Sequence, residues 1–178
     1  MYAETCFLQD GLGQKKTKLK PCRWGIGLNP VPENGFWCKH CGAFVHTLPA
    51  LSGVQNRNHC PYCLWSRHLD HLQAGDRMSA CKALMRPIGL TIKPSHNKYA
   101  SPCAGELMVI HQCSDCGKLS INRIAADDLA EVVAAVFRAS LELDKALRHQ
   151  LDLAGIKPLL QGDEILVNIQ LNGMFNME

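Results

Sequence analysis

The sequence contains no hydrophobic run that approaches the roughly 18 residues of a membrane-spanning helix. Its first residues, MYAETCFLQDGLGQKK, lack the charged stretch, apolar stretch and cleavage site of a secretion signal. No segment is of low complexity, and no repeat is present other than a recurring cysteine pair. These absences exclude a membrane span and a repeat array, and they predict a soluble cytoplasmic protein with no membrane among its partners.

Cysteine is what the sequence has in excess, with 10 in 178 residues. In a secreted chain this number would indicate a disulfide framework, but in a reducing compartment clustered thiols more often bind metal. Charge is unevenly placed: Lys and Arg against Asp and Glu number seven to three over residues 1–58, eight to four over 59–124, and four to nine over 125–178. The cysteine-rich part is therefore cationic and the tail is anionic.

These features predict an α+β protein in three parts. Residues 1–35 form a basic, Gly- and Pro-rich arm, 36–126 a small zinc-ribbon-like β domain with two metal sites, and 127–178 an acidic extension with a helix and a terminal strand. Within the middle part, the patterns FWCKHCGAFVHTL and GELMVIHQCSDCGKLSINRI predict two β-hairpins. The segment GDRMSACKALMRP between them is expected to form a helical turn or two, ended by Pro87.

The tail shows the clearest periodicity. Asp128 as an N-cap, with Glu131 three residues later, predicts the start of a helix that extends to about residue 153. Its apolar stripe either packs on its own domain or contacts a protein partner. The alternation in EILVNIQL, residues 164–171, predicts a half-buried strand. The stripe consists of Leu129, Val133, Val136, Leu143, Leu147 and Leu151.

The spacing of the first four paired cysteines is typical of a zinc site. A Cys-x-x-Cys turn delivers two thiolates to adjacent corners of a tetrahedron, so two such turns complete a site. The pair Cys38 and Cys41 is separated by eighteen residues from the pair Cys60 and Cys63, within the range typical of such sites. The second pair, Cys-Pro-Tyr-Cys, also matches the active-site tetrapeptide of glutaredoxins. That redox interpretation requires a preceding apolar strand, and GVQNRNH is not one.

A second metal site is predicted from Cys113 and Cys116, which form a third Cys-x-x-Cys turn. Cys81 stands alone between turns and is the natural third ligand. For the fourth, the sequence leaves His68 and His111 in competition, with a slight preference for His68. Two zinc ions are therefore the expected cofactors.

Several separated motifs resemble the RNHCP domain family. They are GFWCKHCG, RNHCPYCLWSRHLD, GDRMSACKALMRPIG and HQCSDCGKLSINRIAADD, and they cover about residues 36–128. The resemblance implies a compact zinc-binding domain but no particular activity. The matching positions are Cys38, Cys41, Cys60, Cys63, His68, Asp70, Cys81, His111, Cys113, Cys116 and Arg123.

The favoured function is a zinc module that binds nucleic acid, with structured RNA such as ribosomal RNA as its target, because basic side chains on rigid knuckles can contact phosphates. In the domain, Asn58, Arg86 and Asn122 join the cations as contact candidates, and Trp24 of the arm is available to stack on a base. The predicted cationic contacts are Lys15, Lys16, Lys18, Lys20 and Arg23 of the arm and Arg57, Arg67, Arg77, Lys118 and Arg123 of the domain.

Two other classes of function remain as alternatives. A protein adaptor would dock through the zinc domain and the helix over 128–153. A zinc hydrolase or deaminase would need an open metal position and a general base, and the only near match to such a signature is His68-Leu69-Asp70. The sequence therefore predicts a binding module and no enzyme activity.

Overall fold

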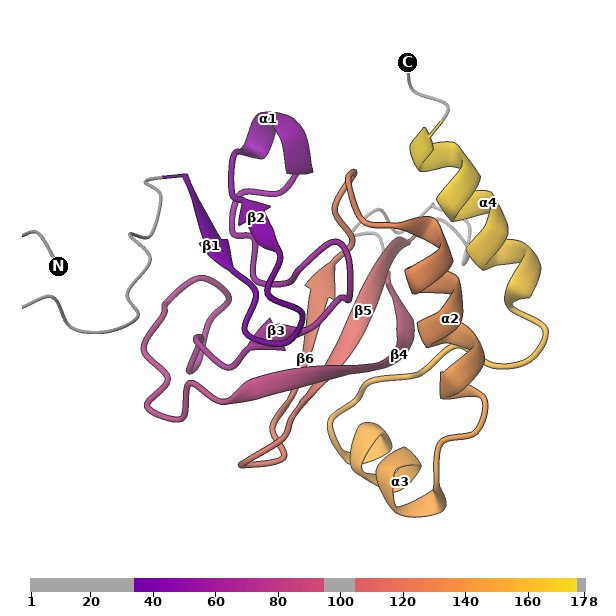
Figure 1. The fold of residues 1–178 in the computed structure, drawn as a ribbon. Coiled ribbons are helices and arrows are strands. Elements are labelled where there is room, and N and C mark those ends of the chain that lie inside the picture. Colours follow the sequence, from indigo (N-terminus) through magenta and orange to yellow (C-terminus); the bar gives the residue numbers. More distant parts are fainter. Residues whose placement is uncertain (1–33, 95–104, 176–178) are drawn as a thin grey trace, which may run out of the picture. The chain divides into compact units, whose positions relative to one another are not determined.

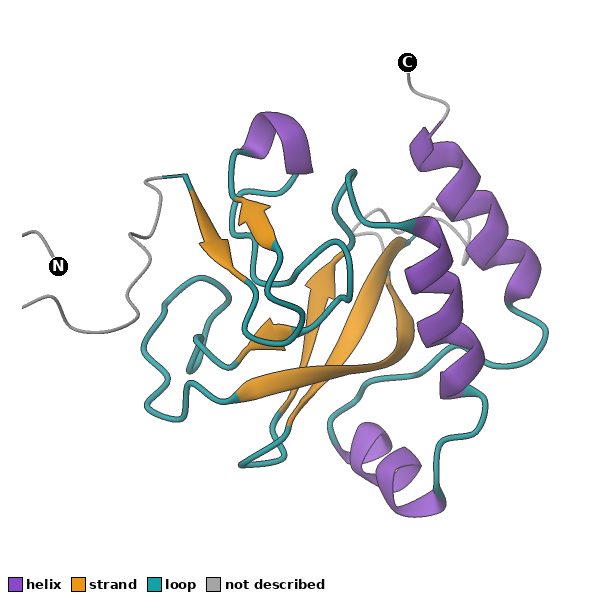
Figure 2. Cartoon of the chain, in the orientation of Figure 1, coloured by secondary structure: helices purple, strands orange, loops and turns teal. Residues whose placement is uncertain are grey.

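The computed structural model describes residues 34–94 and 105–175, so residues 1–33 of the expected arm lie outside them (Figure 1). In these residues the chain forms a two-stranded and a four-stranded antiparallel sheet, with helices α2 and α4 side by side (Figure 2). The fold class is α+β, as predicted. The strands are β1 Gly35–Trp37, β2 Phe44–His46, β3 Ser66–Arg67, β4 Leu84–Lys93, β5 Glu106–Cys113 and β6 Leu119–Arg123, and the helices are α1 Pro49–Ser52, α2 Ala130–Ser140, α3 Lys145–Leu153 and α4 Glu164–Phe175.

Both hairpins expected from the sequence are present. The first consists of β1 and β2, and the second of β5 and β6, which form one half of the sheet β3-β4-β5-β6. In β4 the register shifts between Pro87 and Gly89, which accommodates a proline that has no N–H to give to the ladder. Within the described residues, no helix combines the length and hydrophobicity that a membrane crossing requires.

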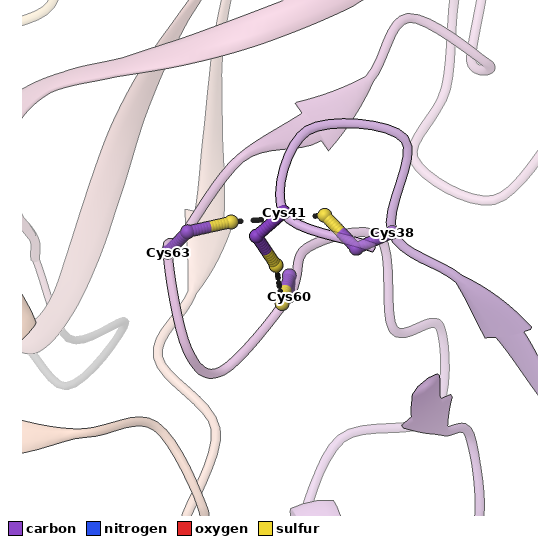
Figure 3. Close-up of side chains that lie close together, drawn as sticks. All are labelled: Cys38, Cys41, Cys60 and Cys63. Carbon is purple, nitrogen blue, oxygen red and sulfur yellow. Dashed lines mark hydrogen bonds between the residues drawn. The ribbon is translucent and has the colours of Figure 1, made fainter. Parts of the chain in front are cut away.

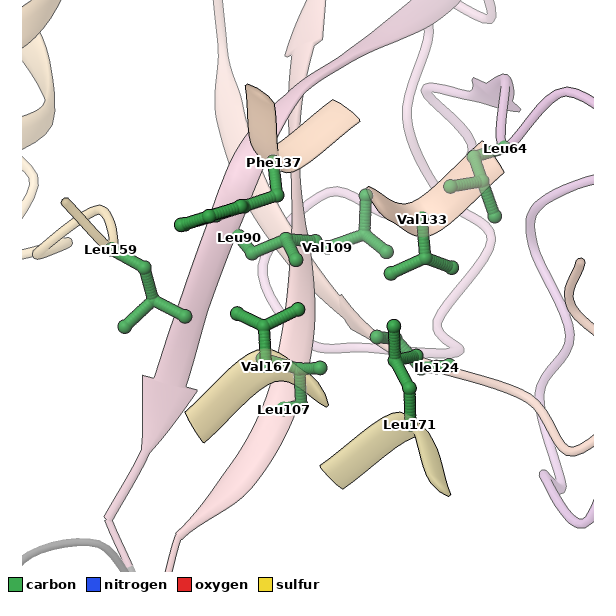
Figure 4. Packing of buried hydrophobic residues seen from close by; sticks show 10 residues of the cluster. All are labelled: Leu64, Leu90, Leu107, Val109, Ile124, Val133, Phe137, Leu159, Val167 and Leu171. Carbon is green, nitrogen blue, oxygen red and sulfur yellow. The ribbon is translucent and has the colours of Figure 1, made fainter. Parts of the chain in front are cut away.

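The four-stranded sheet is covered on both faces, so β5 is buried on both. On one face Leu107 and Val109 of β5 pack against α2 and α4 in the larger core cluster (Figure 4). On the other, Ile110 packs against Leu147 and Leu151 of α3. The C-terminal helices therefore share their hydrophobic core with the sheet. The larger cluster contains Leu64, Leu90, Leu107, Val109, Ile124, Val133, Phe137, Leu159, Val167 and Leu171.

The single helix predicted over 128–153 is instead two helices. Helix α2 ends at Ser140, and α3 begins after Asp144, whose side chain accepts a hydrogen bond from the Leu147 N–H at 2.7 Å. The N-cap of α2 is Leu129, with no side-chain cap. Asp128 does not serve as the cap because its carboxylate is buried in an ion-pair network with Arg57, described below.

The strand predicted over 164–171 is helix α4. Val167 and Leu171, four residues apart, are buried in the larger core cluster, whereas Ile165 and Ile169 are 72% and 65% exposed. A period-two pattern of apolar residues contains every fourth residue as well, so the alternation suited a strand and a helix equally. Packing against the sheet decided for the helix.

The helical turns predicted in GDRMSACKALMRP are also absent, since residues 76–83 are irregular and β4 begins at Leu84. Two carboxylates organise the backbone here. Asp76 accepts hydrogen bonds from the N–H groups of residues 71, 72, 73 and 78, and Asp70 from those of Gly75 and Arg77. Such local side-chain bonds compete with helical hydrogen bonding and hold the loop in its own shape. These backbone bonds lower the pKa of Asp76 well below its usual range.

Candidate metal centres

The three Cys-x-x-Cys pairs adopt one and the same turn. In each turn the first cysteine donates its N–H to the carbonyl five residues later, as Cys38 does to Ala43 at 2.8 Å, and accepts from the N–H four residues later. That fourth residue needs a left-handed backbone, and it is Gly42 in the first turn and Gly117 in the third. The second turn has Leu64 at this position, with φ of 57°. Its side chain is fully buried in the larger core cluster, which compensates for the strain.

The first two turns bring four sulfurs together as site 1, as shown in Figure 3. The Sγ atoms of Cys38 and Cys63 lie 3.7 Å apart, and those of Cys41 and Cys60 lie 3.6 Å apart. A tetrahedral zinc ion with bonds of about 2.3 Å places its sulfurs about 3.8 Å from one another. The donor set and its spacing therefore fit a zinc ion.

Burial makes the second pair of site 1 a poor thiol–disulfide centre. Burial raises the pKa of Cys60 to about 11 and also raises the pKa of Cys63. At Cys41 burial acts in the same direction, but hydrogen bonds from the Ala43 backbone and from neighbouring thiols outweigh it and lower the pKa. A redox cysteine needs a lowered pKa and access to its partner, whereas the sulfurs of Cys60 and Cys63 each lie within 3.7 Å of a sulfur of the other turn. This argues against the glutaredoxin-like interpretation.

Site 2 lies at the end of the four-stranded sheet and brings together His68, Cys81, Cys113 and Cys116. The sulfurs of Cys81 and Cys113 are 3.6 Å apart, and Cys116 Sγ is 3.3 Å from Nδ1 of His68. Burial lowers the pKa of His68, aided by the charges of Lys118 and His71. The imidazole is therefore neutral near pH 7, which is the form that binds a metal.

The competition between the two candidate histidines is decided by their partners. His111 is fully buried, and its Nε2 donates to the carbonyl of Leu64 at 2.6 Å. Its Nδ1 then accepts a hydrogen bond from Nδ2 of Asn122 at 2.9 Å, so both ring nitrogens are engaged. Burial lowers the pKa of His111 to about 4. His111 thus supports the turn that contains Leu64, and His68 is the residue that faces the three thiols.

Arg57, predicted as a nucleic-acid contact, is a buried structural residue instead. Its guanidinium donates to Asp127 Oδ2 at 2.7 Å, to Asp128 Oδ1 at 3.0 Å and to the carbonyl of His59 at 3.1 Å. His59 Nε2 lies 2.7 Å from the other oxygen of Asp128, which also accepts from the Ala125 N–H. This network joins the segment before Cys60 to the start of α2. The sequence analysis did not predict that Asp127 and Asp128 pair with Arg57. The only hint in the sequence was that the two aspartates are adjacent.

A family model described as RNHCP domain matches residues 33–134, which is more than half of the chain. The chain belongs to the RNHCP domain family. No curated protein and no solved structure matches it significantly. The RNHCP domain contains all the ligands of both sites, and it extends far enough to include Asp127 and Asp128.

The other predicted cationic contacts of the domain, and the contacts predicted in the arm, fall into three groups. Arg77 and Arg123 are exposed but paired with carboxylates, those of Asp70 at 3.8 Å and of Glu106 respectively. Arg67 and Lys118 have no carboxylate partner within the described residues, and they contact backbone carbonyls beside site 2. The arm residues Lys15, Lys16, Lys18, Lys20, Arg23 and Trp24 lie outside the described residues.

Sequence reasoning missed several other exposed side chains of the RNHCP domain. The ring of His40, inside the first turn, stacks on Trp65 with centroids 4.1 Å apart and planes 6° from parallel. Tyr62, inside the second turn, is 53% exposed. Lys82, next to the candidate ligand Cys81, is exposed, and its backbone carbonyl accepts a hydrogen bond from Arg67. Adjacency to a cysteine was the signal that would have drawn attention to each of them.

Proposed function

We propose that this RNHCP domain holds two structural zinc ions and binds RNA through the surface around site 2. RNA binding is supported mainly by one observation. Four basic residues belong to the same segments of the chain as the residues of site 2. Arg67 precedes His68, Lys82 follows Cys81, and Lys118 follows the turn of Cys116. Arg86 pairs in the sheet with Gln112, the neighbour of Cys113.

The donor sets support zinc in a structural role. Four thiolates at site 1 and three thiolates with one imidazole at site 2 are ligand sets of closed, tetrahedral zinc sites. A bound zinc ion would supply a cross-link between turns that are distant in sequence. A hydrolase would require an open position, and each site already offers four protein ligands. Asp70, the base that the sequence suggested, is occupied by hydrogen bonds from Asn58, Gly75 and Arg77.

The electrostatic argument for RNA rests on cations without a carboxylate partner. Among the described residues, none of Arg67, Lys82, Arg86 and Lys118 forms a salt bridge, unlike Arg77 and Arg123. Two zinc sites with seven thiolates carry a formal charge of about −3, so attraction to phosphate must come from these side chains and not from the metals. Trp65 and Arg86 border one hollow, so an aromatic side chain and a cation lie at the same depression of the surface, as in surfaces that bind single strands.

The test compares two variants that lose the same charge. One carries Arg67→Gln, Lys82→Gln, Arg86→Gln and Lys118→Gln, and the other Arg77→Gln, Arg123→Gln, Arg138→Gln and Lys145→Gln. Fluorescence anisotropy with an RNA stem-loop, at several salt concentrations, gives the affinity and its salt dependence.

We expect the first variant to lose RNA affinity by about 100-fold or more at low salt and to show a shallower salt dependence, by roughly 0.7 to 0.9 per phosphate contact removed. The second should change affinity by only a few-fold. Equal losses in the two variants, or no binding of the wild type even at low salt, would contradict the proposal.

The adaptor alternative receives less support than RNA binding. Val133, Leu147 and Leu151 of the stripe on which it rested are buried in the core, and Val136 and Leu143 pack against it partly buried. Exposed apolar side chains occur instead on α4, at Ile165 and Ile169. A protein that stays bound after nuclease treatment and high salt, and is lost with Ile165→Lys and Ile169→Lys, would favour the adaptor function.

A further inference from the structure

A hollow of about 230 Å³ lies beside site 2, and neither metal site accounts for it. Its walls come from β3, from β6 and from the loop over residues 69–74. Because β3 and β6 are the two edges of the four-stranded sheet, the sheet must curl to let both edges border the same hollow. The volume is below the roughly 300–1,000 Å³ of sites for drug-sized ligands, and it suits a single ring system.

Two polar side chains that border the hollow can form further hydrogen bonds. The Asn122 side chain has a fixed orientation, because His111 Nε2 donates to Leu64 and its Nδ1 therefore accepts from Asn122 Nδ2. Within the part of the chain that the structure describes, Oδ1 of Asn122 then accepts no hydrogen bond. The Ser120 hydroxyl has only the weak acceptor Met85 Sδ, at 3.8 Å, as a partner in the described part of the chain. An acceptor and a free hydroxyl thus stand side by side on one strand.

The remaining lining is apolar and provides surfaces for a flat ring. Met85, Leu69 and Ile121 border the hollow, and Leu72 stands at its rim with 84% of its side chain exposed. The loop that carries Leu72 is held by Asp70 and Asp76 through its backbone, as described above. A large apolar side chain on a well-anchored loop, exposed next to a hollow, is placed to cover a bound ligand.

Arg67 and Lys118 also border this hollow, so cations flank a site that is polar on one wall and apolar on another. We propose that the hollow binds a single unstacked nucleobase, carried by the RNA strand whose phosphates contact Arg67 and Lys118, and this rests on the proposed function. Single-stranded RNA presents bases whose faces pack on side chains and whose edges form hydrogen bonds. Because Asn122 Oδ1 accepts, a base with an amino group or a ring N–H at that edge fits.

The test separates recognition of the base from attraction to the backbone. The probes are labelled RNA octamers that carry adenine, cytosine or uracil, and an abasic octamer of equal charge. The variant is Leu72→Ala with Ser120→Ala, which alters an exposed residue and a weakly bonded hydroxyl. The control is Met78→Ala, on the same loop, 76% exposed and outside the lining. Native mass spectrometry checks that each protein retains two metal ions.

We expect the wild type to bind at least one base-bearing octamer about 10-fold more tightly than the abasic one, which corresponds to one or two hydrogen bonds and a covered ring. The double variant should reduce this ratio to near 1 with unchanged abasic affinity, and Met78→Ala should preserve it. If RNA binds with the same affinity with or without bases, or if both variants behave alike, the base site is wrong while the proposed function stands.

Mononucleotides form the second arm of the experiment, because the same base can come from a free nucleotide. Binding of AMP, CMP, GMP or UMP that the double variant abolishes, in a protein that binds no RNA octamer, would support the base site and contradict the RNA function. Absence of both nucleotide and RNA binding would overturn the two together.

Discussion

The two candidate metal centres have similar ligands but differ in the hydrophobic packing beneath them. Site 1 lies on the two-stranded sheet, whose hydrophobic cluster has only three buried members, and two of these, Cys38 and Cys60, are themselves ligands. Site 2 lies at the end of a sheet that is packed on both faces by helices. A metal ion at site 1 would therefore take the place of a core, whereas at site 2 it would fix loops on a structure that has a core of its own.

The two regions are joined at the turn of Cys60 and Cys63. Leu64 of this turn is buried in the larger core cluster, and His111 of β5 donates to its carbonyl. Just before the turn, Arg57 reaches the two aspartates at the start of α2. Site 1 is thus anchored to the core through its second pair of cysteines, while its first pair would depend on a bound metal ion.

The largest expected effect comes from removing one exposed candidate ligand from each site. It tests whether metal replaces a core at site 1 but only fixes loops at site 2. With Cys41→Ser we expect amide protection across β1 and β2 to fall by about 100-fold or more, because no apolar core opposes local opening there. With Cys116→Ser, β4 and β5 should keep their protection. Hydrogen exchange measured by mass spectrometry reads both segments in the same sample. Equal protection of β1 and β2 in the two variants would show that site 1 has a second source of stability.

The next largest effect concerns the anchor between the regions. Arg57→Met should lower the free energy of unfolding by about 3–5 kcal/mol, since it leaves the carboxylates of Asp127 and Asp128 without their cation. The matched control Arg77→Met removes an exposed pair and should cost less than about 1 kcal/mol. Urea unfolding of the zinc-loaded proteins measures both. Similar midpoints would mean that the buried network does not stabilise the fold.

A third pair of variants tests whether the sheet and helices carry stability independently of the metals. Val167→Asp places a carboxylate in the larger core cluster and should cost about 2–4 kcal/mol, whereas Ile169→Asp, on the exposed side of α4, should stay within about 0.5 kcal/mol. Both variants should still bind two metal ions by native mass spectrometry. A strand over these residues would place 167 and 169 on the same face and make the two costs alike.

The smallest expected difference is in the response of the two sites to acid. Each site has one thiol whose pKa is lowered, Cys41 and Cys113, so these two do not decide the difference. Metal binding would displace protons from four thiols at site 1 and from three at site 2, because His68, with its pKa lowered by burial, is already neutral and releases no proton.

As pH falls, thiols regain protons and metal affinity decreases at both sites. The decrease should be steeper at site 1 by about one proton, or roughly 10-fold per pH unit, which is about 1.4 kcal/mol. Competition with a chelator between about pH 6.5 and 7.5, with Cys116→Ser and Cys41→Ser to isolate each site, gives the two slopes. Parallel slopes would indicate that His68 also exchanges a proton on metal binding.

The local chemistry was predictable from the sequence because it is encoded by spacing. Cys-x-x-Cys specifies its turn and its pair of thiolates, so the sequence predicted the eight residues that the structure groups into two clusters, with only the choice between His68 and His111 open. That choice depended on what His111 contacts, namely a carbonyl 47 residues earlier in the sequence. No local pattern contains that information.

Where prediction failed, a distant contact outweighed a local preference. Asp128 has the properties of an N-cap, but its carboxylate binds a guanidinium 71 residues away. The apolar alternation of α4 is compatible with two periods, and the sheet beneath it selects the helical one. Leu64 adopts a left-handed backbone at the position that is glycine in the other two turns, and burial of its side chain in the core compensates for the strain.

The buried contact between Arg57 and the two aspartates also sets a limit on how this protein can be shortened. A fragment ending at residue 126 would retain every proposed metal ligand and could be loaded with zinc, yet it would leave a guanidinium enclosed in protein with no counter-charge. In such a fragment we expect the Arg57 side chain to turn outward, because its charge is then solvated by water. Nucleic-acid binding measured on it would then report a cation that the intact protein keeps inside.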